Sequence, residues 1–169
     1  MNRKLMSTKT IGFVGGGRIT RIFLEGWRRA NALPANVLVS DCNADTLAKL
    51  QAQFPGVQTT GDSHAAAAQD IVFLAVHPPV MAEVATAIKG SVKPGAIVVS
   101  LAPKFTLAKL TGLLGGFTRL ARVIPNAPSV VSFGFNPSAF APALSAADKT
   151  DITDRKSTRL NSSHGKVSR

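Results

Sequence analysis

The chain has 169 residues, 45% of them hydrophobic, which predicts one globular domain with a real core and excludes a disordered chain. The formal net charge of +11 favours anionic ligands, but the basic residues are scattered and tyrosine is absent, so no nucleic-acid partner is expected. The single cysteine cannot form an internal disulfide, which suits a reducing cytoplasm. No apolar run is long enough to span a bilayer and the start does not resemble a leader peptide, so we expect a cytoplasmic protein with no membrane partner.

Short apolar runs alternate with helical patterns along the chain. Strands are predicted at residues 10–15, 37–41, 56–60, 71–76, 96–102 and 118–124. Helices are predicted at residues 19–30, 44–53, 63–69, 79–88 and 106–114. The run IVFLAV at 71–76 is apolar without alternation, as expected for a strand that is covered on both faces. This order predicts an α/β fold, a doubly wound parallel sheet of the Rossmann dinucleotide-binding type.

A glycine-rich loop, GGGRIT, joins the first predicted strand to the first predicted helix. Gly15 and Gly17 match the first two glycines of a dinucleotide fingerprint, and Thr20 stands where a third glycine or an alanine is usual. Gly15 allows a tight turn, and Gly17 lets the backbone approach a pyrophosphate with no Cβ in the way. The start of the helix offers amide donors and the positive end of its dipole to the phosphates. The alternative is a glycine-rich turn that binds nothing.

Asp41 ends the second predicted strand, at the spacing where a dinucleotide fold places the carboxylate that holds the adenosine ribose. The alternative is a turn aspartate that caps the helix beginning at Ala44. The surrounding residues, SDCN, offer an acid and no cation for a 2′-phosphate, so Arg18 would have to reach that phosphate. The cofactor is therefore NADP or NAD, with NAD at least as well favoured.

Four segments in order resemble the amino-terminal domain of the pyrroline-5-carboxylate reductase family. They are IGFVGGGRIT, AVHPP, VSLAPKFTLAKL and ARVIPNAPSVV, and the resemblance spans roughly residues 10–138. The family usually reads G-x-G-x-M-A in the loop, A-V-K-P after the fourth strand, S-x-A-A-G after the fifth and M-P-N-T-P after the sixth. This sequence departs from that pattern at Ile19-Thr20, His77, Pro103-Lys104 and Ala127. The deazaflavin-dependent NADP oxidoreductases share much of the same domain.

The resemblance implies the nucleotide-binding half of an NAD(P)H-dependent reductase that transfers a hydride to a cyclic imine, as in proline biosynthesis. Its partners would be the dinucleotide cofactor and a small imine or amino-acid substrate. A helical second domain, which is missing here, would bind the substrate and form a homo-oligomer, so the fragment alone is expected to be inactive. The catalytic residues are unknown and no metal is expected. The alternatives are a non-catalytic dinucleotide-binding module and a deazaflavin-dependent NADP oxidoreductase.

The residues matched to the family's cofactor-binding positions follow the carboxyl ends of predicted strands. They are Gly15, Gly17, Arg18, Ile19 and Thr20 in the pyrophosphate loop, Ser40 and Asp41 at the ribose end, Ala75, Val76, His77 and Pro78 after the fourth strand, and Ala102 and Asn126 after later strands. His77 is either a titratable group near the nicotinamide or an ordinary loop histidine. Asn126 is either a hydrogen-bonding group for a carboxamide or substrate acid, or a turn residue between two prolines.

The end of the chain differs in composition from the rest. Residues 154–164, DRKSTRLNSSH, can be back-translated into one reading frame of a common DNA sequencing adapter. A solvated basic tail and a nucleic-acid-binding arm are the alternatives. We therefore expect an N-terminal extension at residues 1–9, an NAD(P)-binding domain at 10–147 and a non-native or disordered tail at 148–169.

Overall fold

Strands and helices alternate along the computed structural model, which describes residues 9–124 and 138–156. The strands are β1 (Ile11–Val14), β2 (Val37–Ser40), β3 (Gln58–Thr60), β4 (Ile71–Leu74), β5 (Ile97–Ser100), β6 (Leu120–Val123) and β7 (Ser138–Phe140). The helices are α1 (Arg18–Arg29), α2 (Ala44–Gln53), α3 (Ser63–Ala67), α4 (Pro78–Ile88), α5 (Leu107–Leu113) and α6 (Ala146–Lys156). Within the described residues, no helix is both long and apolar enough to span a membrane.

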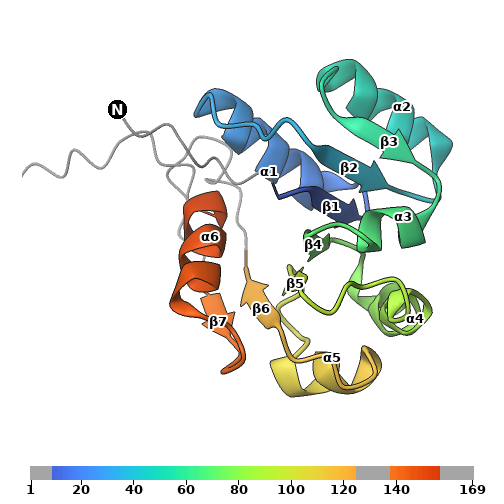
Figure 1. Ribbon diagram of the computed structural model, residues 1–169. Coiled ribbons are helices and arrows are strands. Elements are labelled where there is room, and N and C mark those ends of the chain that lie inside the picture. The colour runs from blue at the N-terminus through green and yellow to red at the C-terminus, as the bar shows by residue number, and fades with distance from the viewer. Residues whose placement is uncertain (1–8, 125–137, 157–169) are drawn as a thin grey trace, which may run out of the picture.

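The strands form a single sheet in the order β3-β2-β1-β4-β5-β6-β7 (Figure 1). Neighbouring strands are parallel except for β6 and β7, which are antiparallel with Ala121 opposite Phe140. This topology confirms the predicted doubly wound α/β fold. The sheet is mostly parallel rather than wholly so, because β7 adds an antiparallel edge that the sequence pattern does not predict.

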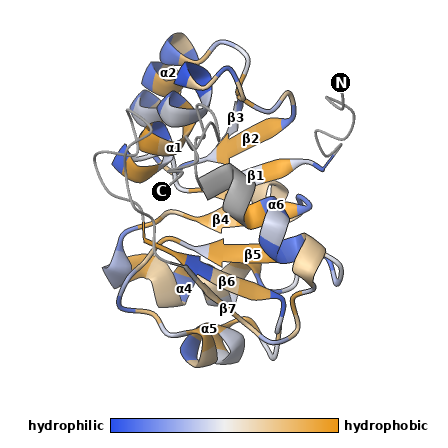
Figure 2. Cartoon of the chain, turned by 90° about the vertical axis from the view of Figure 1, so that its left-hand side faces the viewer, coloured by the Kyte–Doolittle hydropathy of each residue, from blue (hydrophilic) through white to orange (hydrophobic). Residues whose placement is uncertain are grey.

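Side chains of the central strands alternate between the two faces of the sheet. Phe13 and Phe73 belong to the core beneath α1, α2 and α6, and their rings stack with centroids 4.7 Å apart. Val14 and Leu74, one position further along, belong to the core beneath α3, α4 and α5. The central strands β1 and β4 are accordingly hydrophobic along their length, between helices of mixed polarity (Figure 2). Cover on both faces explains the unbroken apolar runs in the sequence.

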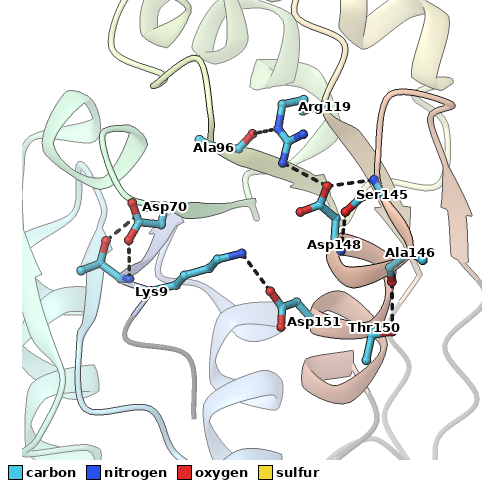
Figure 3. Close-up of polar contacts among 10 residues, drawn as sticks. Lys9, Asp70, Ala96, Arg119, Ser145, Ala146, Asp148, Thr150 and Asp151 are labelled. Carbon is cyan, nitrogen blue, oxygen red and sulfur yellow. Dashed lines mark hydrogen bonds and ion pairs between the residues drawn. The ribbon is translucent and has the colours of Figure 1, made fainter. Parts of the chain in front are cut away.

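Helix α6 spans the predicted boundary between residues 147 and 148 and packs against the sheet, where Ile152 is buried. Ser145 and Asp148 form a capping box: the Ser145 amide donates to Asp148 Oδ2 at 2.9 Å, and the Asp148 amide donates to Ser145 Oγ at 3.1 Å. Arg119, just before β6, pairs with Asp148 at 3.0 Å, and Lys9 pairs with Asp151 at 2.9 Å (Figure 3). These contacts attach α6 to the sheet at both its β1 side and its β6 side.

The acid stability of the domain is expected to depend on Asp148. Burial raises the pKa of this carboxyl, but hydrogen bonds from Ser145 and the Arg119 guanidinium outweigh burial and hold the pKa below its ordinary value. A lowered folded-state pKa means that this stability is present above the unfolded pKa of about 4 and is lost as the pH falls through the folded pKa.

Asp148→Asn is therefore expected to lower the free energy of unfolding at neutral pH by roughly 1–3 kcal/mol and to flatten its acid dependence. Urea unfolding at several pH values measures both effects. Asp151→Asn is the control, because its ion pair with Lys9 is partly exposed and contributes at most about 1 kcal/mol. Equal losses of unfolding free energy in Asp148→Asn and Asp151→Asn would contradict the role of Asp148.

Candidate dinucleotide-binding site

The sheet reverses its strand order between β1 and β4, and this is where ligands bind in open α/β sheets. The chain leaves β1 toward β2 on one side and returns through β4 on the other, so the loops after β1 and β4 lead to helices on opposite faces of the sheet. Gly15 follows β1, and its amide donates to the Ser40 carbonyl at 2.8 Å. Ala75 follows β4, and its amide donates to the Val14 carbonyl at 2.8 Å. The predicted glycine loop thus lies at the switch point of the sheet.

Gly15 is required by the backbone at this point. Its φ is +109°, a conformation that residues with a Cβ rarely adopt. A Cβ placed on Gly15 would lie 2.7 Å from the Ala75 carbonyl oxygen, inside van der Waals contact. Gly15 therefore makes the tight turn that the sequence predicts, and it allows the loop after β1 to pass close to the loop after β4.

Gly17 has a different role, because nothing in the described structure crowds it. It is the N-cap of α1, with extended backbone angles and no side chain to cap the helix. A Cβ on Gly17 would have no atom outside its chain neighbours within 4 Å. The position is open in front of the first turn of α1, whose leading amides have no partner within the helix. An anion can approach the backbone there, as a pyrophosphate requires.

Thr20 occupies the place of the third glycine and stabilises the loop through its side chain. The residue is fully buried, and its Oγ1 donates a hydrogen bond of 2.6 Å to the Gly15 carbonyl oxygen. Because Gly15 is also buried, that carbonyl would otherwise need another donor. The hydroxyl thus joins the first turn of α1 to the tight turn after β1.

Thr20→Val keeps the shape of the side chain and removes the hydroxyl. We expect the free energy of unfolding to fall by roughly 1–3 kcal/mol, because the Gly15 carbonyl is left unpaired, and dinucleotide affinity to fall with it as the loop loosens. Urea unfolding and a cofactor titration measure the two effects. Thr111→Val is the matched control, since its hydroxyl bonds only to the Leu107 carbonyl of its own helix. A Thr20→Val protein indistinguishable from this control would contradict the prediction.

Asp41 closes the loop from the β2 side. Its Oδ2 accepts a hydrogen bond from the Gly16 amide and its Oδ1 accepts one from the Asn43 amide, both at 2.8 Å. The helix cap of α2 is Asn43, whose Oδ1 accepts from the amides of Asp45 and Thr46. The alternative in which Asp41 caps that helix is therefore wrong. Its carboxylate connects the glycine loop to the end of β2, where an adenosine ribose is expected.

Gly16 is the residue of this site that the sequence pattern does not single out. Its amide is the donor to Asp41, and a Cβ on Gly16 would come within 3.3 Å of Val39 Cγ1 and 3.4 Å of Asp41 Cβ. The fingerprint treats this position as variable. The signal available in the sequence was the run of three glycines, with a carboxylate at the end of the next strand.

The other predicted residues that the structure describes lie along the same carboxyl edge, with different exposure. Ser40 is buried and its Oγ donates to the Phe13 carbonyl at 3.3 Å, so the hydroxyl points into the sheet. The exposed residues are Arg18 on α1 and His77 and Pro78 at the start of α4; the partly buried ones are Ile19, Ala75 and Val76. Ala102 is buried just after β5. Asn126 lies outside the described residues.

The comparisons with known proteins agree with this geometry. A family model described as NADP oxidoreductase, coenzyme F420-dependent, matches residues 10–104. The pyrroline-5-carboxylate reductase of Escherichia coli (strain K12) is 32% identical over 148 residues, which is 85% of this chain and 55% of that protein. The chain spans about half the length of the curated relatives it matches.

Solved structures show the same architecture. A pyrroline-5-carboxylate reductase from Coxiella burnetii superposes with a TM-score of 0.82 at 28% identity, over 90% of this chain and 57% of that one. The pyrroline carboxylate reductase of Plasmodium falciparum, with NADP bound, superposes with a TM-score of 0.78 at 20% identity, over 90% of this chain and 56% of that one. These matches confirm the resemblance that the sequence motifs predict.

Proposed function

Because the chain belongs to the family described as NADP oxidoreductase, coenzyme F420-dependent, we propose that it is the nucleotide-binding half of an NAD(P)H-dependent reductase. The whole enzyme would transfer a hydride to the C=N bond of a cyclic imine, like the pyrroline-5-carboxylate reductases that the chain resembles. The observation that supports this most directly is the glycine loop at the switch point, joined to Asp41 by the Gly16 amide.

Each part of the site supplies a different contact to a dinucleotide. The open backbone at Gly17 and the first-turn amides of α1 would hold the pyrophosphate. Asp41, fixed by two amides, has lone pairs left to accept hydrogen bonds from ribose hydroxyls. The segment from Ala75 to Pro78 and the end of β5 at Ala102 would border the nicotinamide. A bound NAD(P)H supplies the hydride, and these residues would orient its ring.

Reduction of an imine also requires a group that binds the substrate and protonates its nitrogen. Tyrosine is absent from the sequence, and His77 is an exposed residue at the start of α4 with no hydrogen bond from its side chain to the helix start. We propose that the catalytic donor belongs to the portion of the relatives' length that this chain does not span. The same portion would bind the imine or amino-acid substrate and form the homo-oligomer.

We also propose a cytoplasmic location and no nucleic-acid or membrane partner. Cys42 is free and exposed beside the predicted ribose position, which suits a reducing compartment.

The test of the proposed function has two stages. The 169-residue chain is titrated with NADH and NADPH, following nicotinamide fluorescence, and we expect saturable binding without turnover of pyrroline-5-carboxylate. The source gene is then resequenced beyond the codon for Asp151, and the protein from any longer reading frame is assayed for imine reduction. Failure of both dinucleotides to bind would contradict the proposal. Binding without turnover by the longer protein would favour a non-catalytic module.

A further inference from the structure

Arg122 is a charged side chain at a position where the strand pattern favours an apolar one. It is the third residue of β6, opposite Ser100 of β5, and it lies on the same face of the sheet as Leu120. Leu120 is fully buried in the core beneath α3, α4 and α5, and Arg122, two residues further along, is half-buried. Taking a guanidinium partly out of water costs free energy unless its donors are paired, so the partners of Arg122 indicate its role.

The guanidinium of Arg122 is paired with the backbone of the loop between β5 and α5, residues 101–106, which we call the β5 loop. Its Nη1 donates to the Pro103 carbonyl at 3.4 Å and to the Phe105 carbonyl at 3.5 Å. Both distances are long for a hydrogen bond, because one nitrogen is shared between two acceptors. None of the ion pairs among the described residues involves Arg122. Its charge is therefore directed at two carbonyls of the β5 loop.

The β5 loop is otherwise fixed at its two ends rather than in its middle. At the start, the Ala102 amide donates to the buried Ser100 Oγ at 3.2 Å. At the end, the Phe105 side chain is buried in the core beneath α5. Residues 103–104 between them form an exposed turn. The bonds from Arg122 thus hold this turn from the side of β6.

The β5 loop begins beside the loop that follows β4. The Leu101 amide donates to the Leu74 carbonyl at 3.1 Å, which bonds the first residue of the β5 loop to the last residue of β4. The segment after β4 and the residue Ala102 are the parts of the chain that the proposed function places along the nicotinamide. A shift of the β5 loop would consequently move one border of that ring.

We propose that Arg122 is a positioning residue for the nicotinamide end of the dinucleotide site, acting through the Pro103 and Phe105 carbonyls. The inference rests on the proposed function, which places the nicotinamide beside Ala102. Arg122 does not itself contact the cofactor in this proposal. It holds the β5 loop against β6, so that Ala102 presents a fixed surface to the ring before the dinucleotide binds.

The test compares dinucleotides with analogues that lack the nicotinamide. The 169-residue chain and its variants are titrated with NADH and ADP-ribose, and with NADPH and 2′-phospho-ADP-ribose, by isothermal titration calorimetry. Arg122→Met removes the donor and is expected to weaken the dinucleotide by roughly three- to tenfold, while its analogue stays within about twofold. The members of each pair carry the same phosphate charges, so loss of the Arg122 charge affects both alike and cancels in the ratio of their affinities.

Two further variants separate positioning from general stability. Arg122→Lys keeps a donor at the same strand position and should recover part of the lost dinucleotide affinity. Arg119→Met is the matched control, because Arg119 also donates to a backbone carbonyl beside β5, that of Ala96 at 3.2 Å, but at the amino-terminal edge of the sheet (Figure 3). This control should lower stability in urea through the lost ion pair with Asp148 and leave the affinity ratio unchanged.

The outcomes separate this inference from the proposed function. If the unsubstituted chain binds neither the dinucleotides nor their analogues, the proposed function is overturned and the inference with it. An unchanged affinity ratio in a folded Arg122→Met protein would overturn the inference alone, as would an equal fall in Arg119→Met or no recovery in Arg122→Lys. Circular dichroism establishes that each variant is folded. If Arg122→Met does not fold, Arg122→Gln replaces it, with the same selective loss expected.

Discussion

Replacing Gly17 with aspartate is expected to abolish dinucleotide binding while the domain stays folded. The structure separates the two effects, because a Cβ on Gly17 would meet no described atom within 4 Å apart from its chain neighbours, and the backbone angles there are extended. The new carboxylate would stand in front of the α1 first turn, at the place proposed for the pyrophosphate. Like charges would then repel where the amides and the helix dipole attract. We expect affinity to fall by roughly 100-fold or more, measured by fluorescence titration.

Two further variants make this prediction specific. Gly56→Asp adds the same charge at another uncrowded glycine, before β3, and should leave binding close to that of the unsubstituted chain. Gly17→Ala adds only a methyl group and should weaken binding less than aspartate does. All three proteins should unfold at similar urea concentrations. Full dinucleotide affinity in a folded Gly17→Asp protein would remove this loop from the cofactor site.

The central strands could be predicted because local pattern and tertiary structure agree there. IVFLAV has no alternation, and β4 is indeed covered on both faces by helices. The elements at the carboxyl end of the chain could not be predicted in the same way. α6 buries Ile152, and its Asp148 forms an ion pair with Arg119, a residue far away in the sequence. A polar helix that docks through an ion pair has no apolar periodicity to detect.

The site shows the same division between local and long-range signals. Gly15 and Gly17 were identifiable because their spacing is fixed by the turn and helix start that a pyrophosphate needs. The bond from Gly16 to Asp41 joins two loops that are adjacent only because β1 and β2 pair in the sheet. Thr20 stands where the pattern usually has a glycine or an alanine. Only the structure shows that its buried hydroxyl donates a hydrogen bond to the Gly15 carbonyl and so supports the loop.

Gly12 carries the largest expected effect on stability, and no motif draws attention to it. It lies in β1 where α3 crosses the sheet, and a Cβ placed there would fall 1.9 Å from the Ala66 carbonyl oxygen and 2.8 Å from its carbonyl carbon. Both atoms are backbone, so a change of rotamer cannot relieve the clash. Either β1 or α3 must move, and β1 also carries the glycine loop.

Gly12→Ala is therefore expected to lower the free energy of unfolding by roughly 3 kcal/mol or more, measured by urea unfolding. Gly112→Ala is the control of opposite sign. It lies in α5 with no atom within 4 Å of its added Cβ, and alanine there should stabilise the helix by roughly 0.5–1 kcal/mol.

If Gly12→Ala is too unstable to purify, Gly12→Ala combined with Gly112→Ala can be compared with Gly112→Ala alone. A Gly12→Ala protein as stable as the unsubstituted chain would show that α3 does not pack this closely on β1. The geometry inferred for the loop after β1 would then also need revision, because β1 is the strand that positions that loop.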